Sequence, residues 1–214
     1  MFINFFVMLP TNPRWKLERK TLGQMFFKEK LRIMIGIVKH HTVKQFKPWI
    51  SAIEKNGEHR INAMEVFERI NAYSLNHICF GLDNNDDMFD FLWYDRNTDT
   101  FTEKKVTITE AVPNLSIQCM VRRFRRLSSP VGILWLLFKI NLSNNEVERN
   151  VEENSRRLYK HVDKYVQERK SGVTKSQMEG ADLLSHYLAN PDIFTDDHVI
   201  GGMIGTIFPG IETS

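Results

Sequence analysis

The sequence predicts a mainly α-helical protein with little or no sheet. Apolar residues recur at a spacing of three or four through most of the chain, which is the spacing of a helix face. Helix boundary signals such as Asn12-Pro13 and Gly57 separate these stretches, and the strict alternation typical of strands is almost absent. With 214 residues, 42% of them hydrophobic, the chain is long enough to bury the core of one globular domain or part of a larger one.

The first helix is expected to begin at Pro13, with Asn12 as its cap, and to continue through Lys20. Trp15 and Arg19 are four residues apart, so they project from one face of this helix. Trp15 offers an indole N–H and Arg19 a planar guanidinium, and two such donors suit a carboxylate. The alternative interpretation is a surface cation–π pair without a ligand.

Two further helices are expected over residues 28–56 and 63–79. Pro48 is expected to kink or split the first of them, and Gly57 to end it. Both carry apolar residues at helical spacing, namely Leu31, Met34, Ile35, Val38, Phe46, Trp49, Ile50 and Ile53 on the first, and Phe67, Ile70, Leu75 and Ile78 facing inward on the second. We interpret the histidines of this region, His40, His41 and His77, as structural.

The middle of the chain gives weaker signals. Residues 83–87 are acidic but lack the glycine and the distal glutamate of a calcium loop, so a solvated loop is expected there. Residues 89–101 show a mixed pattern that assigns no element. A helix is expected over residues 107–124 despite Pro113.

A basic cluster at residues 122–126 precedes an apolar run at residues 131–138. Basic residues beside an apolar run that contains a tryptophan fit a membrane-surface contact better than nucleic acid. A buried segment with a charged rim is the alternative. The formal net charge of +3 is too small to argue for nucleic acid by itself, and we predict no nucleic-acid partner. A helical nucleic-acid binder, which would rest on residues 122–126 alone, is the third hypothesis.

The last part of the chain is expected to contain three helices. Residues 144–170 predict a long amphipathic helix with a buried stripe of Val147, Val151, Leu158, Val162, Tyr165 and Val166. A polar linker and a short helix over residues 181–188 follow. The final helix opens with Thr195 as its cap and with Asp196 and Asp197 in its first turn, and its apolar residues predict burial.

The end of this final helix combines Pro209, Gly210, Glu212 and Thr213. Pro209 frees a backbone carbonyl, and Gly210 leaves room for a small ligand. Glu212 and Thr213 together could hold water and pass protons to that ligand. The alternative is that Pro209 and Gly210 simply end the helix.

The Trp15 and Arg19 pair and the end of the final helix lie about two hundred residues apart. In this order, the two motifs resemble those of the cytochrome P-450 family of haem-thiolate monooxygenases. Trp15-x-x-x-Arg19 resembles the W-x-x-x-R motif of the family's C helix. Residues 209–214 resemble the A/G-G-x-D/E-T-T/S motif of its I helix, with Pro209 where the family has Ala or Gly. The resemblance implies an incomplete P-450 fold, helices C to I, in which residues 1–214 are a single partial domain without the N-terminal sheet region and the C-terminal haem-thiolate region.

The resemblance also implies roles for five residues. Trp15 and Arg19 would contact the propionates of haem, which is iron protoporphyrin IX. Gly210 would open the oxygen groove, and Glu212 and Thr213 would be catalytic residues that deliver protons.

Other family motifs are not matched. The E-x-x-R helix of the family lies beyond the I helix, so we interpret Glu153-x-x-Arg156 as a charged helix face. Only Gly81 fits the ligand loop around Cys79, and nothing fits around Cys119, so we predict no metal-ligating residue. The haem of the complete protein is therefore not expected to be retained by this fragment.

The resemblance implies a monooxygenase that inserts one atom of O2 into a small organic substrate, with electrons from an NADPH-dependent reductase. This chain alone is expected to be inactive. The implied location is the cytoplasmic face of the endoplasmic reticulum membrane, with the cytoplasm as the alternative. The alternative function is a non-catalytic helical interaction or membrane-surface module.

Overall fold

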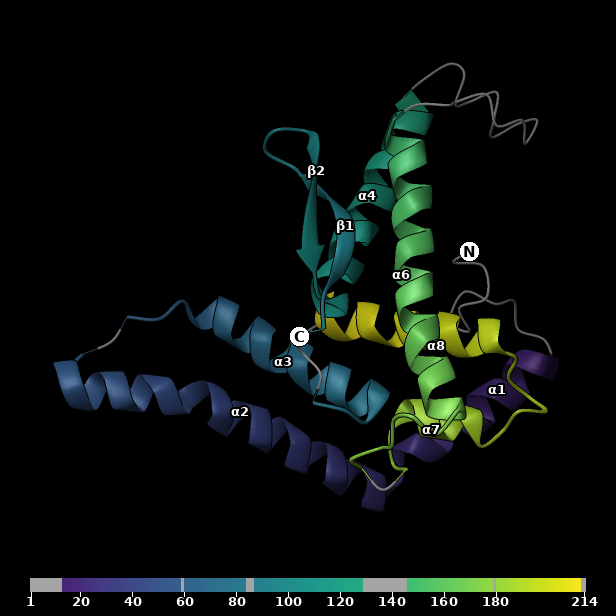
Figure 1. Ribbon diagram of the computed structural model, residues 1–214, viewed down its shortest axis with the longest axis horizontal. Helices are drawn as coiled ribbons and strands as arrows, with labels where there is room; N and C mark the ends of the chain where they lie inside the picture. The colour runs from purple at the N-terminus through teal and green to yellow at the C-terminus, as the bar shows by residue number, and fades with distance from the viewer. Residues whose placement is uncertain (1–12, 59, 84–86, 129–145, 179, 213–214) are drawn as a thin grey trace. The chain divides into compact units, whose positions relative to one another are not determined.

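The computed structural model describes residues 13–58, 60–83, 87–128, 146–178 and 180–212. They form helices and one two-stranded sheet (Figure 1), which confirms the predicted mainly α fold class. In chain order the elements are α1 (Pro13–Gly23), the short 3-10 helix η3 (Gln24–Phe26), α2 (Lys28–Asn56), α3 (Ala63–Phe80), β1 (Phe89–Asp95), β2 (Thr100–Val106), α4 (Ile108–Ser128), α6 (Glu146–Lys170), α7 (Leu183–Leu188) and α8 (Asp196–Glu212). The chain divides into two compact units, Met1–Asn85 with Val162–Ser214, and Asp86–His161.

Helix α8 lies deep in the first unit, where it packs against α3 and α7. Four of its apolar side chains are at most 1% exposed: Val199, Ile200, Met203 and Ile207. The predicted burial of the final helix is therefore confirmed. The predicted buried stripe of α6 is confirmed as well, because all six of its residues are at most 5% exposed.

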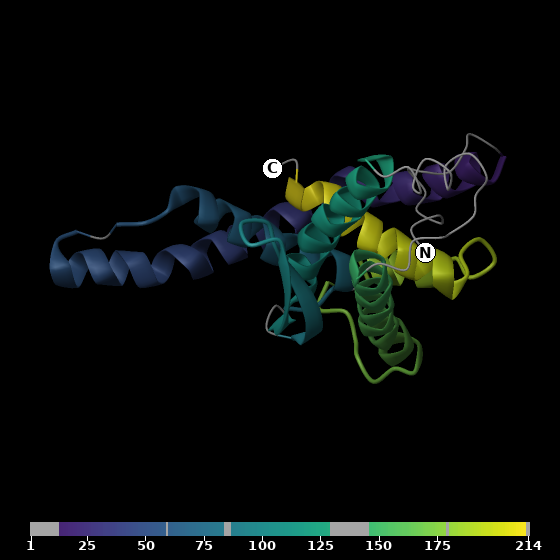
Figure 2. The same ribbon diagram turned by 90° about the horizontal axis from the view of Figure 1, so that it is seen from above.

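Helices α2 and α3 lie side by side in both views (Figures 1 and 2). α2 has the predicted bounds and ends at Gly57, whose φ of 80° is the left-handed conformation that glycine tolerates. Pro48 lies inside this helix and does not split it. The apolar stripe of α2 is not its buried face, since Ile35 is 67% exposed and α2 buries Ile37 and His41. Phe67 of α3, expected to face inward, is also exposed.

A buried histidine pair joins these two helices. Nε2 of His41 lies 3.2 Å from Nδ1 of His77, and the two side chains are 0% and 9% exposed. Burial lowers the pKa of His41 to about 4 and also lowers the pKa of His77, despite the nearby carboxylate of Asp83. Both rings are therefore neutral near pH 7, one donating and the other accepting, as the structural interpretation expects.

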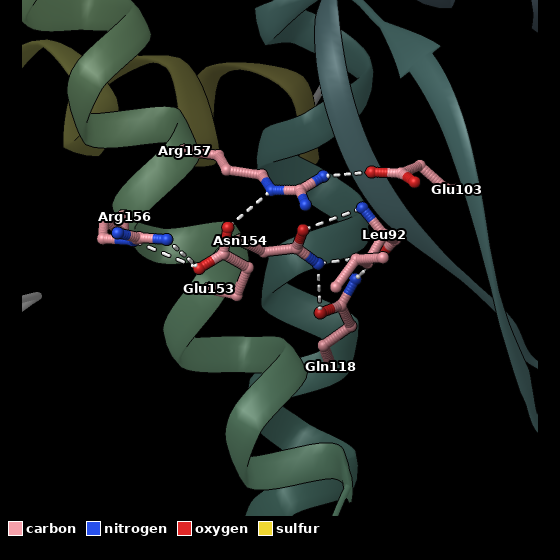
Figure 3. A network of polar contacts seen from close by, with 7 residues as sticks. All are labelled: Leu92, Glu103, Gln118, Glu153, Asn154, Arg156 and Arg157. Carbon is pink, nitrogen blue, oxygen red and sulfur yellow. Dashed lines mark hydrogen bonds and ion pairs between the residues drawn. The ribbon is translucent and has the colours of Figure 1, made fainter.

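The second unit contains the hairpin that the sequence left unassigned. β1 and β2 pair antiparallel, with Phe89 opposite Val106. Backbone groups of β1 that do not bond to β2 pair with carboxamides from α4 and α6 (Figure 3). The Asn154 side chain accepts from Leu92 N at 2.8 Å and donates to Leu92 O at 2.7 Å, and Gln118 bridges to both. Such pairing satisfies a strand edge without a third strand.

No helix in the described ranges combines the length and apolar character needed to cross a membrane. The apolar run at residues 131–138, and with it the predicted membrane-surface contact, lies outside the described residues.

Because α7 approaches α8 closely at Gly202, we expect a side chain at this position to destabilise the fold. A Cβ built there would overlap with the hydroxyl group of Tyr187, and Tyr187 is 2% exposed and packed edge-on against Phe194. We expect Gly202→Ala to lower the free energy of unfolding by about 1–3 kcal/mol, as for other overpacked cores. Urea titration followed by circular dichroism measures the change.

Gly36→Ala is the matched control, since a Cβ at this α2 position meets nothing within 4 Å. It should raise the free energy of unfolding by about 0.5–1 kcal/mol, because alanine favours helix interiors. Equal effects of the two substitutions would contradict the close approach.

The histidine pair predicts a loss of stability in mild acid. Because the folded pKa values lie below the unfolded value of about 6.5, the unfolded chain binds more protons as the pH falls from about 6.5 to 4. The free energy of unfolding should fall across this window by up to about 1.4 kcal/mol per pH unit and histidine. The double substitution His41→Gln and His77→Gln should flatten this part of the pH profile, and an unchanged profile would contradict the burial of the pair as neutral rings.

Candidate functional site

The predicted donor pair lies on the exposed face of α1. The guanidinium carbon of Arg19 lies 5.0 Å from the centroid of the Trp15 ring, so the two side chains form the cation–π pair considered above. This contact uses the face of the indole, whereas the N–H donors of both groups lie at their edges. The pair therefore orders two donors side by side and remains compatible with a carboxylate ligand.

These residues line a surface pocket of about 460 Å³, together with neighbours from the same helix and the turn after it. Its lining consists of Trp15, Lys16, Arg19, Lys20, Gly23, Gln24 and Phe27. Three of these side chains are cationic, and no carboxylate is among the described lining residues. Within the described part of the chain none of the three cations has an ion pair of its own, so the pocket favours an anionic ligand with a flat apolar portion.

The sequence pattern did not predict Lys16 and Lys20 as residues of the site. They are four residues apart, as Trp15 and Arg19 are, and this repeated spacing was the signal that could have found them. Phe27, which is 62% exposed, carried no comparable signal because it lies beyond the end of the helix.

The second predicted motif lies at the carboxyl end of α8. The helix continues through Pro209 and Gly210 to Glu212, so the alternative that these two residues end it is wrong. The side chain of Glu212 and all of Thr213 lie outside the described residues, and the roles given to Gly210, Glu212 and Thr213 stay predictions. The described pocket lining comes from α1 to Phe27 and includes no residue of α8, so it does not bring the two motifs together.

Burial disfavours the thiolate form of both cysteines. Cys79 is 0% exposed, and burial raises the pKa of its thiol to about 12. Burial also raises the pKa of Cys119, against the opposing effect of Arg122. The described residues contain no cluster of three or more His, Cys, Asp or Glu side chains that could hold a metal ion.

The E-x-x-R match is a surface ion-pair network, as interpreted above (Figure 3). Glu153 accepts hydrogen bonds from Arg157 and Arg156, and these bonds hold the pKa of its carboxyl below the usual value. Arg157 also donates to Glu103 of β2 at 2.7 Å, so the network joins α6 to the hairpin of the second unit.

The basic cluster of α4 is partly neutralised. Arg125 donates to Asp99 at 2.6 Å, and Arg122 lies 3.8 Å from Glu148. Pairing with carboxylates weakens the attraction of these arginines for phosphate groups.

Comparison with known proteins identifies a family. The sequence model of the family described as Cytochrome P450 matches residues 1–214. A search of curated protein sequences found no match.

The protonated, buried state of Cys79 predicts resistance to alkylation. In the native chain at neutral pH, iodoacetamide should modify Cys79 about a hundredfold more slowly than in denaturant, since only the thiolate reacts. Mass spectrometry of a Cys119→Ser variant isolates this thiol. Rapid labelling of Cys79 under native conditions would show that it is accessible as a thiolate.

Proposed function

The chain belongs to the cytochrome P450 family, and from this premise we propose that Trp15 and Arg19 hold haem propionates in a monooxygenase acting on an organic substrate. Family membership supports a haem-dependent monooxygenase type of function. The observation that carries the residue assignment is the pocket on α1, with ordered Trp15 and Arg19 donors and three cations without ion pairs in the described part of the chain. When bound, haem supplies the activation of O2.

The donor chemistry of the pocket fits that cofactor. A propionate is a carboxylate on a flexible arm, and it can accept from the Trp15 N–H and from the Arg19 guanidinium together. Haem carries two propionates, and Lys16 and Lys20 add positive charge beside the donor pair. These residues bind and orient the cofactor and offset the charge of its carboxylates.

The proton-handling part of the proposal concerns the end of α8. Here we propose that Gly210 leaves room for O2, and that Glu212 and Thr213 hold a water molecule and pass its proton. The continuation of the helix through Gly210 supports this proposal, because it carries Glu212 on the same element.

The wider assignments follow from the family. We propose a small organic substrate, an NADPH-dependent reductase as electron donor, and a location on the cytoplasmic face of the endoplasmic reticulum membrane. We propose also that this chain is a fragment that is inactive alone and does not retain haem through purification. The buried, protonated state of Cys79 supports this last point, since it offers no axial thiolate.

A second candidate is a non-catalytic helical interaction module. The observation in its favour is the set of exposed apolar side chains along α2, of which Ile35 and Ile50 are 67% and 53% exposed. An apolar helix face of this kind can bind another helix. It does not account for the cationic pocket on α1, so the haem assignment stands first.

The propionate assignment predicts a selective effect of Arg19. Hemin added to the purified chain should bind about tenfold more weakly to Arg19→Ala than to the natural sequence, because a charge-assisted hydrogen bond is lost. Hemin dimethyl ester, which has no free carboxylates, should bind both proteins equally. Absorbance titration measures all four affinities.

Arg32→Ala on α2 is the matched control, since Arg32 is exposed and lies outside the pocket. It should leave both affinities unchanged. Equal binding of hemin by the natural sequence and Arg19→Ala, or no preference for hemin over its ester, would contradict the assignment.

The absence of an available thiolate predicts the spectrum of the chain. After reduction and addition of carbon monoxide, the hemin-loaded chain should not show the absorption band of a haem-thiolate complex. Appearance of this band, and its loss in Cys79→Ser or Cys119→Ser, would show that a cysteine of this chain ligates the iron.

A further inference from the structure

We propose that His186 is a positioning residue for the cofactor donors of α1, through a buried hydrogen bond to the carbonyl of Thr21. Nε2 of His186 lies 2.7 Å from this oxygen, and the two residues are 165 positions apart in the chain. Both side chains are 7% exposed. The inference rests on the proposed function, because it concerns the helix that carries Trp15 and Arg19.

In the described part of the chain, helix α1 buries little of its surface. Its described side chains from residue 15 to residue 20 are exposed or half-buried, and burial begins only in the last turn, at Thr21 and Leu22. Met25 of η3 is the next buried residue. The part of α1 that presents the donors therefore projects from an anchor near its carboxyl end.

The carbonyl of Thr21 is well placed to serve as that anchor. It belongs to the last turn of α1, where backbone carbonyls lack the full set of helical partners. A buried carbonyl without a partner is costly, and the hydrogen bond from His186 satisfies it. Arg19 lies only two residues before Thr21, so a shift of this turn moves the pocket directly.

The donor, His186, lies on α7, a helix that contacts with its neighbours hold in place. Asp182 caps α7 by accepting from Ser185 N at 2.8 Å, and Arg169 of α6 donates to Ser185 Oγ at 2.8 Å. Tyr187, the residue after His186, packs against Phe194 with ring centroids 4.7 Å apart. α7 is therefore held on both sides of His186, which can transmit that rigidity to α1.

The hydrogen bond to Thr21 also defines the protonation state of His186. A carbonyl only accepts, so Nε2 of His186 carries the proton. Burial lowers the pKa of His186, the Thr21 carbonyl opposes this effect, and Lys30 adds to it. His186 is accordingly a neutral imidazole with its proton on Nε2, and it donates without placing a second charge near the cationic pocket.

The test compares His186→Leu, which removes the donor, with His186→Gln, whose amide can reach the same carbonyl. Hydrogen exchange by mass spectrometry on the full chain should show residues 13–23 exchanging about fivefold faster in His186→Leu, as expected for loss of one hydrogen bond, with α8 unchanged. Hemin affinity should fall about as much, while affinity for hemin dimethyl ester stays constant. His186→Gln should restore both properties, and the exposed His40→Leu serves as control.

Other outcomes overturn the inference. Unchanged exchange in α1, or faster exchange in every helix together with equal loss of hemin and ester binding, would show a merely structural histidine.

If His186→Leu does not fold, His186→Asn replaces it, since its shorter amide cannot reach Thr21. Equal behaviour of the Asn and Gln variants would contradict the proposal. If Arg19→Ala leaves hemin binding unchanged, the proposed function itself fails; if Arg19→Ala weakens binding but His186→Leu does not, only the inference fails.

Discussion

The first unit depends on a buried ion pair between Arg169 and Asp182, which are 9% and 0% exposed at their side chains. Arg169 also donates to the carbonyl of Phe80 at the end of α3, and Asp182 caps α7, so one guanidinium connects α3, α6 and α7. Removing one partner of such a pair leaves an uncompensated buried charge, which is strongly destabilising. α7, fixed in this way, directs His186 to α1 and Tyr187 to α8. The site helices are thus oriented by polar contacts as well as by apolar burial.

Much of this fold was predictable because its signals are local. Gly57 marks the end of α2, and the stripe of α6 lies at the spacing of one helix face. The hairpin escaped prediction because β1, Phe-Asp-Phe-Leu-Trp-Tyr-Asp, lacks alternation, and its backbone groups are satisfied by amides from α4 and α6. The buried face of α2 was not predictable for a related reason. Periodicity identifies a helix but does not determine which of two adjacent apolar faces packs, and here the face of Ile37 does.

The site residues also differ in whether a local sequence pattern predicts them. Spacing of four residues placed Trp15 and Arg19 together, and their contact follows from helix geometry alone. The same spacing holds for Lys16 and Lys20, whose role emerges only from the pocket that they share. His186 was beyond sequence reasoning, because its partner lies 165 residues away and no local pattern connects them. The roles of Glu212 and Thr213 rest on resemblance, since their local pattern alone also fits a helix end.

The central claim is that α1 presents Trp15 and Arg19 to a carboxylate of haem. The most direct measurement is an experimental structure of the complete haem-bound protein. The account predicts that one propionate accepts hydrogen bonds from both Trp15 Nε1 and the Arg19 guanidinium, at about 2.7–3.2 Å. Propionates bound by other residues, with Trp15 and Arg19 facing solvent, would contradict it.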